Sequence, residues 1–446
     1  MAMRPPPVGV DTDSAKPLPR VVTRRRVYHV AGYDPIGAAW YRVFKRELVT
    51  FTRTWNVASE ISDLMSRSGT SNARWKVTTR APNWHVETTY EPLLWDDIVL
   101  KDRSQPLVKR LARSCLAFFD FVMSGAAFRY FKANWQYGLF FLYPFLWVFV
   151  FAAVAVALGY WVASLLALAT VWHVALVVVV SLVVFTVLLH WPGQRLRVQH
   201  GLDDWIFSFE YVHNRRPDVE ARLDHFAETL VAGARDTALD EIIIVGHSMG
   251  ATFALEIVTR ALALDPNLGR HGPAVCLLTV GSTVPKFTLH PAGERFRRHA
   301  ARVADEPSIA WAEYQARADA ISFYKFDPVA RSRFYVDPVC SKPVIRRVQI
   351  HDMLTKQTYR RFRLRFMRLH YQFVMANERR STYDYFMMVC GPIPFARSTL
   401  NAGGHVEAIA PDGALTEPVA PAPGEASMAR GESASAGGLS RNKQTR

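Results

Sequence analysis

One stretch of the sequence decides the fold: Glu241-Ile242-Ile243-Ile244-Val245-Gly246-His247-Ser248-Met249-Gly250, followed directly by Ala251-Thr252-Phe253-Ala254-Leu255-Glu256-Ile257. The apolar run that ends at Val245 is typical of a parallel strand buried on both faces. The run that begins at Ala251 has the composition of a helix. The pattern Gly-x-Ser-x-Gly lies between them. The stretch therefore predicts a buried strand, a sharp turn and a helix.

The two glycines of this pattern have a steric explanation. The central residue of such a turn is held in a strained backbone conformation, and bulk at either flanking glycine would clash with the strand or the helix. Ser248 would then project from the sheet with its hydroxyl exposed. The backbone N–H of Met249, at the helix N-terminus, would point at the negative charge that develops on an attacked carbonyl oxygen.

Further strands and helices alternate on both sides of this stretch. On the N-terminal side we expect a strand at Val27 to Val30, a helix from about Ala38 to Trp55, two strands at Arg74 to Arg80 and His85 to Tyr90, and a helix opened by Pro217 and Asp218. On the C-terminal side we expect strands at Ala274 to Val280, Ile309 to Ala316 and Val344 to Ile350. This alternation predicts an α/β fold with a mainly parallel sheet and helices on both faces.

A long uncharged segment interrupts the alternation. From Gly138 to His190 there are 53 consecutive residues without Asp, Glu, Lys or Arg. About 20 apolar residues cross a bilayer, so this length predicts a transmembrane hairpin of two helices, with a buried core region of a soluble protein as the alternative. We expect the turn at about Gly159 to Ser164, although Trp172 and His173 leave its position open. Basic residues flank both ends (Arg129, Lys132, Arg195 and Arg197), which favours cytoplasmic flanks.

Composition bounds the remaining possibilities. Half of the 446 residues are hydrophobic, and the formal net charge is +15. This composition excludes a disordered, collagen-like or disulfide-knotted chain. The four cysteines (Cys115, Cys276, Cys340 and Cys390) have no metal-ligand spacing, so we expect no zinc site and a reducing compartment. Residues 1–25 and 401–446 are expected to be disordered tails, which leaves 26–137 and 191–400 as the two parts of one domain around the hairpin at 138–190.

Two segments suggest contact with a membrane surface, each with an alternative. Five arginines of one predicted helix (Arg360, Arg361, Arg363, Arg365 and Arg368) form either a solvated face or a surface for anionic lipid headgroups. The stretch from Leu107 to Tyr130 is either an interfacial amphipathic segment or an ordinary packing helix. We expect no nucleic-acid partner, because no binding motif accompanies the charge.

The strand, Gly246-His247-Ser248-Met249-Gly250 and helix resemble the nucleophile elbow of the α/β-hydrolase superfamily, and more closely that of its lipase and esterase members of the membrane-anchored bacterial type. The resemblance covers roughly residues 26–400, but only the elbow is specific. It implies that a strand, an acid, another strand and a histidine follow Ser248 in that order. Asp319 follows the strand that ends at Ala316 and is the first choice for the acid, with Asp327 as the alternative.

Two histidines compete for the role of general base. His351 directly follows the strand from Val344, whereas His370 stands before an aromatic residue in a stretch that resembles the terminal part of bacterial hydrolase-like proteins. We prefer His370. His247 is expected to pack within the elbow, because its position directs it away from the serine hydroxyl. The second oxyanion donor is assigned by position to Tyr33, where the usual His-Gly or multiple-glycine signature is absent.

Together these residues predict a membrane-anchored serine hydrolase that cleaves a lipid or other acyl ester through an acyl-enzyme. Ser248, Asp319 and His370 would form the triad, and the N–H groups of Met249 and Tyr33 would bind the oxyanion. We expect no metal or organic cofactor, and a bacterial inner membrane with both termini cytoplasmic. A catalytically silent membrane scaffold is the alternative. The substrate, the choice between hydrolysis and acyl transfer, and the oligomeric state stay open.

Overall fold

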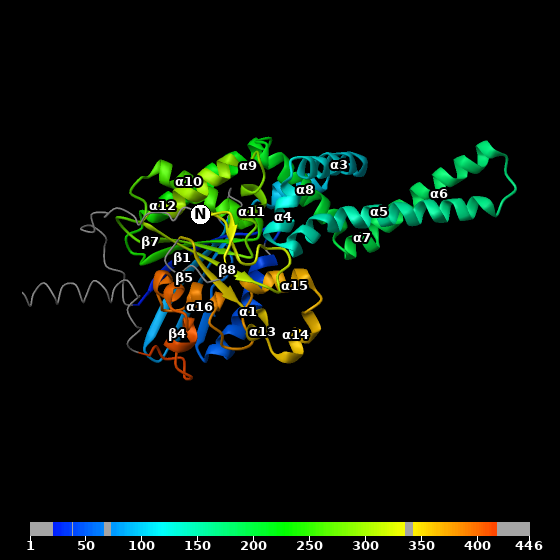
Figure 1. Cartoon of the computed structure of the whole chain (residues 1–446). Coiled ribbons are helices and arrows are strands. Elements are labelled where there is room, and N and C mark those ends of the chain that lie inside the picture. Colours follow the sequence, from blue (N-terminus) through cyan, green and yellow to red (C-terminus); the bar gives the residue numbers. More distant parts are fainter. Residues whose placement is uncertain (1–20, 38, 67–72, 335–341, 417–446) are drawn as a thin grey trace, which may run out of the picture.

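The computed structural model describes residues 21–37, 39–66, 73–334 and 342–416. Among these residues the main sheet is mostly parallel (Figure 1). Its strands lie in the order β11 (Val344–Val348), β8 (Ile309–Ala316), β7 (Ala274–Val280), β6 (Glu241–His247), β1 (Arg24–Val30), β5 (Trp84–Pro92), β4 (Ala73–Ala81) and β2 (Ala58–Ile61). Every neighbouring pair from β11 to β5 is parallel, whereas β4 pairs antiparallel with both β5 and β2. The short β3 (Met65–Ser66) pairs with β4, and β9 (Phe326–Asp327) pairs with β10 (Ser332–Arg333).

Helices cover both faces of the sheet, which confirms the predicted layering. Along β6 the apolar side chains alternate: Ile243 and Val245 pack into one buried cluster, and Ile242 and Ile244 into the other. The first cluster includes α1 (Ala39–Trp55) and α16 (Tyr385–Cys390). The second includes α8 (Val198–Val212), α9 (Pro217–Ala234), α10 (Met249–Leu264) and α12 (Glu294–Asp305). The mixed α/β class predicted from the sequence is therefore present.

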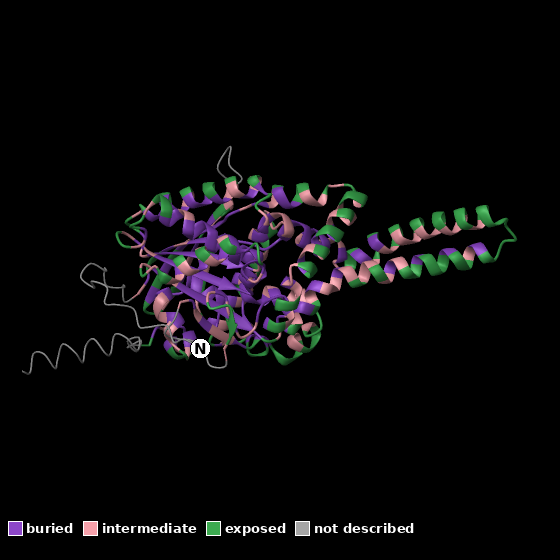
Figure 2. Ribbon diagram, turned by 45° about the horizontal axis from the view of Figure 1, so that its top comes forward, coloured by how far each residue is buried: buried purple, intermediate pink, exposed green. Residues whose placement is uncertain are grey.

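Two helices, α5 (Trp135–Ser164) and α6 (Thr170–His190), form a hairpin that projects away from the sheet and its helices (Figure 1). Both are long and apolar enough to cross a membrane. Most of the projecting surface is exposed (Figure 2). The turn lies at residues 165–169, so the expected position at Gly159 to Ser164 is wrong. Gly159 instead lies where the two helices approach closely, since a Cβ there would be 2.7 Å from the Val177 carbonyl oxygen.

The other predicted elements are present with shifted ends. The strand expected up to Ile350 stops at Val348, because Ile350 begins α13 (Ile350–Met353). The arginine-rich segment predicted as one helix forms two, α14 (Lys356–Phe362) and α15 (Phe366–Tyr371). The remaining helices are α2 (Asp96–Arg103), α3 (Leu107–Met123), α4 (Ala126–Ala133), α7 (Pro192–Arg195), α11 (Val284–Thr288), η1 (Gln372–Val374), α17 (Phe395–Leu400) and α18 (Gly404–Ala408).

Both segments that were predicted to be disordered tails include folded residues. β1 begins at Arg24, and the buried Arg25 donates to Glu241 at 2.6 Å, so residues 24 and 25 belong to the sheet. Residues 401–416 are folded as well. The indole of Trp84 donates to the Gly413 carbonyl at 2.9 Å, and the Asn83 side chain exchanges two hydrogen bonds with the Leu415 backbone. Polar side chains thus hold a segment that is poor in large apolar residues. Residues 1–20 and 417–446, and Cys340, lie outside the described residues.

Candidate active site

The turn after β6 has the strained geometry that its sequence predicts. Ser248 has φ of 58° and ψ of −123°, and its N–H donates to the Val280 carbonyl at 3.1 Å. A Cβ on Gly246 would lie 2.5 Å from the Cα of Ala251, at the start of α10. A Cβ on Gly250 would lie 2.6 Å from the Ala31 carbonyl, just after β1. Both glycines are therefore required by close packing against helix and strand, as expected.

Asp319 and His370 meet beside this turn. The Nδ1 of His370 lies 2.9 Å from the Oδ2 of Asp319, and both side chains are almost fully buried. The Oδ1 of Asp319 accepts the Ile321 N–H at 3.0 Å, which fixes the carboxylate. Nδ1 therefore donates to the aspartate, and Nε2 is the nitrogen left with a lone pair. That Nε2 is buried without a hydrogen-bond partner among the described residues.

Gly281 is a site residue that the sequence analysis missed. It follows β7 with φ of +53°, and a Cβ there would lie 2.9 Å from the Cε1 of His370 and 3.3 Å from the Oδ2 of Asp319. Its missing side chain leaves the space that the histidine ring and the carboxylate occupy. The signal in the sequence was a glycine directly after a predicted strand, in Gly281-Ser282-Thr283.

The two alternative residues lie elsewhere. His351 is half exposed on α13 and pairs with its neighbour Asp352 at 3.2 Å. Asp327 accepts the N–H groups of Val329 and Ala330 and so stabilises a turn. His370, which pairs with Asp319, therefore lines the pocket together with Ser248, whereas His351 and Asp327 do not line it.

His247 packs within the elbow, as predicted. Its ring lies 4.5 Å from the ring of His370 and 5.1 Å from that of Tyr371. Its Nε2 lies 3.1 Å from the main-chain oxygen of His370, so it contacts the backbone that carries the candidate base. Burial lowers the pKa of His247 well below its usual value, so the ring is neutral and its Nε2–H donates this hydrogen bond.

The loop after β1 borders Ser248 on the other side. A Cβ on Gly32 would lie 2.9 Å from the Cβ of Ser248, so only a glycine allows this approach. The next residue is Tyr33, whose N–H was assigned as an oxyanion donor. Met249 opens α10, where the first N–H groups of a helix have no acceptor within the helix. Tyr33, Met249 and Ser248 line the same pocket.

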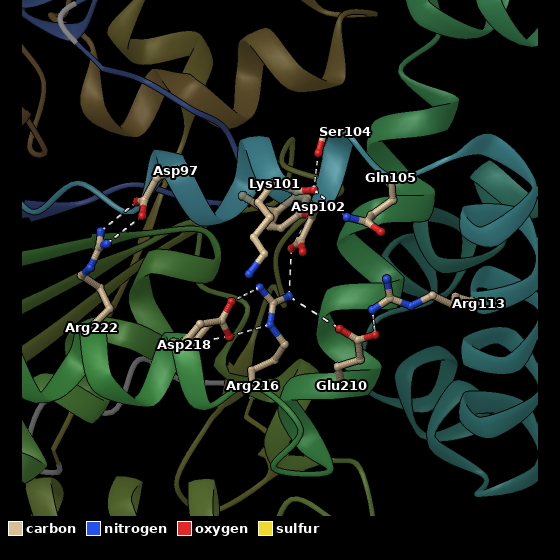
Figure 3. Close-up of polar contacts among 12 residues, drawn as sticks. Asp97, Lys101, Asp102, Ser104, Gln105, Arg113, Glu210, Arg216, Asp218 and Arg222 are labelled. Carbon is tan, nitrogen blue, oxygen red and sulfur yellow. Dashed lines mark hydrogen bonds and ion pairs between the residues drawn. The ribbon is translucent and has the colours of Figure 1, made fainter.

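A polar network holds the side chain of Tyr33 in place. Its hydroxyl donates to the Oδ2 of Asp102, at 3.1 Å. Figure 3 shows Asp102 contacting Arg216, which also pairs with Asp218 and Glu210. The Arg216 guanidinium lies on the face of a buried aromatic ring of α8. The network thus joins α2 to α8 and α9 and braces the loop that borders Ser248.

The pocket at Ser248 is narrow, about 50 Å³. Its apolar wall comes from two places far apart in the chain. The base of α5 contributes Tyr137, Phe140, Tyr143 and Pro144, and α15 contributes Phe366 and Met367. The first helix of the hairpin is therefore part of the wall around the candidate nucleophile. A space of this size holds a few water molecules, so a larger ligand requires these walls to separate.

Charged groups form another part of the wall. Asp34 accepts hydrogen bonds from Tyr371 at 2.7 Å, from Arg197 at 3.0 Å and from Arg103 at 3.1 Å. Burial alone would raise the pKa of Asp34, but the neighbouring cationic groups and the Tyr371 hydroxyl outweigh it and lower the pKa to about 2. Asp34 is therefore an anion at neutral pH that ties α15 to the loop after β1.

One group of side chains could hold a metal ion, away from the pocket lining. The ligand atoms of Asp120, His213 and His290 lie within 4.8 Å of one another. As they stand, both histidines contact the carboxylate of Asp120, at 3.0 and 2.9 Å. The Nδ1 of His290 accepts the Ala292 N–H, so its Nε2 carries the proton of the neutral ring and donates to Asp120. The sequence spacing gave no sign of this group, which joins α3 to the residue that follows α8 and to the segment after α11.

Comparisons with family models, with curated proteins and with solved structures find no match to this chain.

Proposed function

We propose that this protein is a membrane-anchored serine hydrolase of the α/β-hydrolase type, with Ser248 as nucleophile, His370 as general base and Asp319 as the acid that orients it. The observation that carries the proposal is the buried hydrogen bond from His370 to Asp319. It leaves the Nε2 of His370 without a partner among the described residues, in the pocket that Ser248 lines. The strained φ of Ser248 supports the same assignment, because such strain clusters at active sites.

In the proposed reaction, the Nε2 of His370 accepts the Ser248 hydroxyl proton as the oxygen attacks the ester carbonyl. The Asp319 carboxylate stabilises the imidazolium that forms. The N–H groups of Met249 and Tyr33 bind the tetrahedral oxyanion, which collapses as His370 protonates the departing alcohol. Water, deprotonated by His370, then attacks the acyl-enzyme. Breakdown of the second tetrahedral intermediate releases the carboxylic acid and returns the proton to Ser248.

The walls of the pocket favour an amphiphilic ester as substrate. Tyr143 and Pro144 belong to a helix that is long and apolar enough to cross a membrane, and both line the pocket with Ser248. An acyl ester held in the bilayer could therefore approach along the hairpin without passing through water. We assign the hydrolase domain to the cytoplasmic side, as the basic flanks of the hairpin favour.

Hydrolysis of lipid esters by the purified full chain in nanodiscs tests this function. We expect release of fatty acid from a phospholipid or glyceride, and its loss in Ser248→Ala. The matched control is Ser308→Ala, which removes the hydroxyl of a partly buried serine. Ser308 lies just before the amino-terminal end of β8, whereas Ser248 follows the carboxyl end of β6. If Ser248→Ala retains full activity, the assignment is wrong. A folded protein without activity on any ester would favour the scaffold alternative.

A further inference from the structure

The segment between α14 and α15 combines a protruding leucine with unpaired positive charge. Leu364 is 88 % exposed, the highest value among the exposed large apolar side chains that the structure describes. Four exposed arginines stand next to it in the chain: Arg360, Arg361, Arg363 and Arg365. We call this segment, residues 360–365, the basic corner.

None of these four arginines forms an ion pair within the part of the chain that the structure describes. Other arginines of the protein are neutralised; Arg216, for example, contacts three carboxylates. In the basic corner the guanidinium groups of Arg361 and Arg365 lie 5.6 and 5.8 Å from the centre of the Phe362 ring. The corner therefore presents uncompensated positive charge around an exposed apolar side chain, which is the combination that binds anionic lipid surfaces.

The length of the hairpin locates the membrane surface relative to this corner. At 1.5 Å per residue, the helix from Tyr143 to Ser164 is about 32 Å long, and so is the segment from Thr170 to Trp191. These lengths match a hydrocarbon core of about 30 Å. Tyr143 and Trp191 would then lie at the near interface, where such aromatic residues are enriched, and the Arg195 guanidinium covers the Trp191 ring at 5.0 Å.

The basic corner adjoins this interface. Phe366, the first residue of α15, has its ring 5.7 Å from that of Tyr143 and 6.5 Å from that of Phe140. In Figure 1, α14 and α15 lie on the side of the domain from which the hairpin projects. Phe366 and Met367 also line the pocket, and His370 lies on the same short helix. The corner thus connects the membrane side of the domain to the candidate base.

We propose that the basic corner docks on the anionic surface of the bilayer, with Leu364 inserted among the headgroups and the four arginines bound to lipid phosphates. Docking moves α15 relative to the base of α5 and so widens the narrow pocket between them. The docking itself goes beyond the proposed hydrolase function, whereas its effect on the pocket rests on that function.

A fluorophore at position 364 measures the docking directly. The variant Leu364→Cys, with Cys115→Ser and Cys340→Ser to remove the other candidate labelling sites, is labelled with bimane and placed in nanodiscs that carry quencher on the lipid chains. We expect strong quenching in nanodiscs with about one third anionic phosphatidylglycerol and weak quenching in neutral phosphatidylcholine. Raising the salt concentration should reduce the difference. The control is Leu264→Cys, an exposed leucine at the end of α10, which should be unquenched in both.

A charge-neutralised variant distinguishes binding to anionic headgroups from insertion of residue 364 into the bilayer that does not depend on lipid charge. Replacing the four arginines by glutamine should lower the quenching in anionic nanodiscs to the neutral level. Replacing two exposed arginines elsewhere, Arg235 at the end of α9 and Arg298 on α12, by glutamine should not. Equal quenching in anionic and neutral nanodiscs overturns the headgroup proposal, and absence of quenching in both overturns docking altogether.

The rate at which a fluorophosphonate labels Ser248 measures the effect on the pocket. We expect anionic lipid to raise this rate several-fold in the wild type and to leave the charge-neutralised variant unchanged. A rate that is independent of lipid charge, with quenching as expected, would retain docking and overturn the widening. If Ser248 does not react at all, the hydrolase function fails, while the quenching still reports on docking.

Discussion

Replacing Gly281 by alanine perturbs the candidate site through one added methyl group. The new Cβ would lie 2.9 Å from the Cε1 of His370, whereas ordinary contacts begin at 3.4 Å, so the two must separate by about half an ångström. Since a misplacement of 1 Å can reduce a rate by about 100-fold, we expect the reactivity of Ser248 to fall about tenfold. The left-handed backbone at φ +53° adds a loss of about 1–2 kcal/mol in stability.

The assay is the second-order rate constant for labelling Ser248 with a fluorophosphonate, together with thermal unfolding. Gly125→Ala is the matched control, because Gly125 has φ of +76° and, among the described residues, no atom lies within 4 Å of the added Cβ. Both variants should lose similar stability, and only Gly281→Ala should react more slowly. A folded Gly281→Ala protein that is labelled at the wild-type rate would show that the position of His370 relative to Gly281 does not control the reactivity of Ser248.

Three further changes test other contacts. Asp319→Asn should lower the rate of Ser248 labelling by about 10³ to 10⁴-fold, through loss of the required histidine tautomer, whereas Asp327→Asn should change it less than about threefold. Tyr33→Phe removes the hydrogen bond to Asp102, so unfolding in detergent should show a loss of about 1 kcal/mol. Burial raises the pKa of Glu313 to about 7, so its protonated form is favoured in the folded state and stability falls as the pH rises from about 4.5 to 7. Glu313→Gln should therefore add about 3 kcal/mol to the free energy of unfolding at pH 8 and almost nothing at pH 4; equal effects at both values would contradict this linkage.

The elements around the elbow could be predicted because their sequence signals are local. The apolar run before Gly246 and the strands that end at Val280 and Ala316 lie where the pattern placed them. The position of Asp319 beside His370 agrees with the expectation that the carboxyl ends of parallel strands meet at one edge of a sheet. The two glycines of the elbow were explained correctly by steric contact with β1 and α10.

What the sequence could not provide depends on contacts between distant residues. The role of Gly281 requires the position of His370, which lies 89 residues later in the chain. The folded segment up to residue 416 depends on side chains of Asn83 and Trp84, more than 300 residues earlier. The turn of the hairpin was misplaced because Gly159 is a point of close helix packing, which composition alone does not distinguish from a turn.

The measurement that tests the central claim most directly is the site of fluorophosphonate labelling, mapped by mass spectrometry on the full chain in membranes. We expect a single adduct on Ser248, which is lost in His370→Ala and retained in His351→Ala. An adduct on another residue, or labelling of Ser248 that survives in His370→Ala and disappears in His351→Ala, would contradict it.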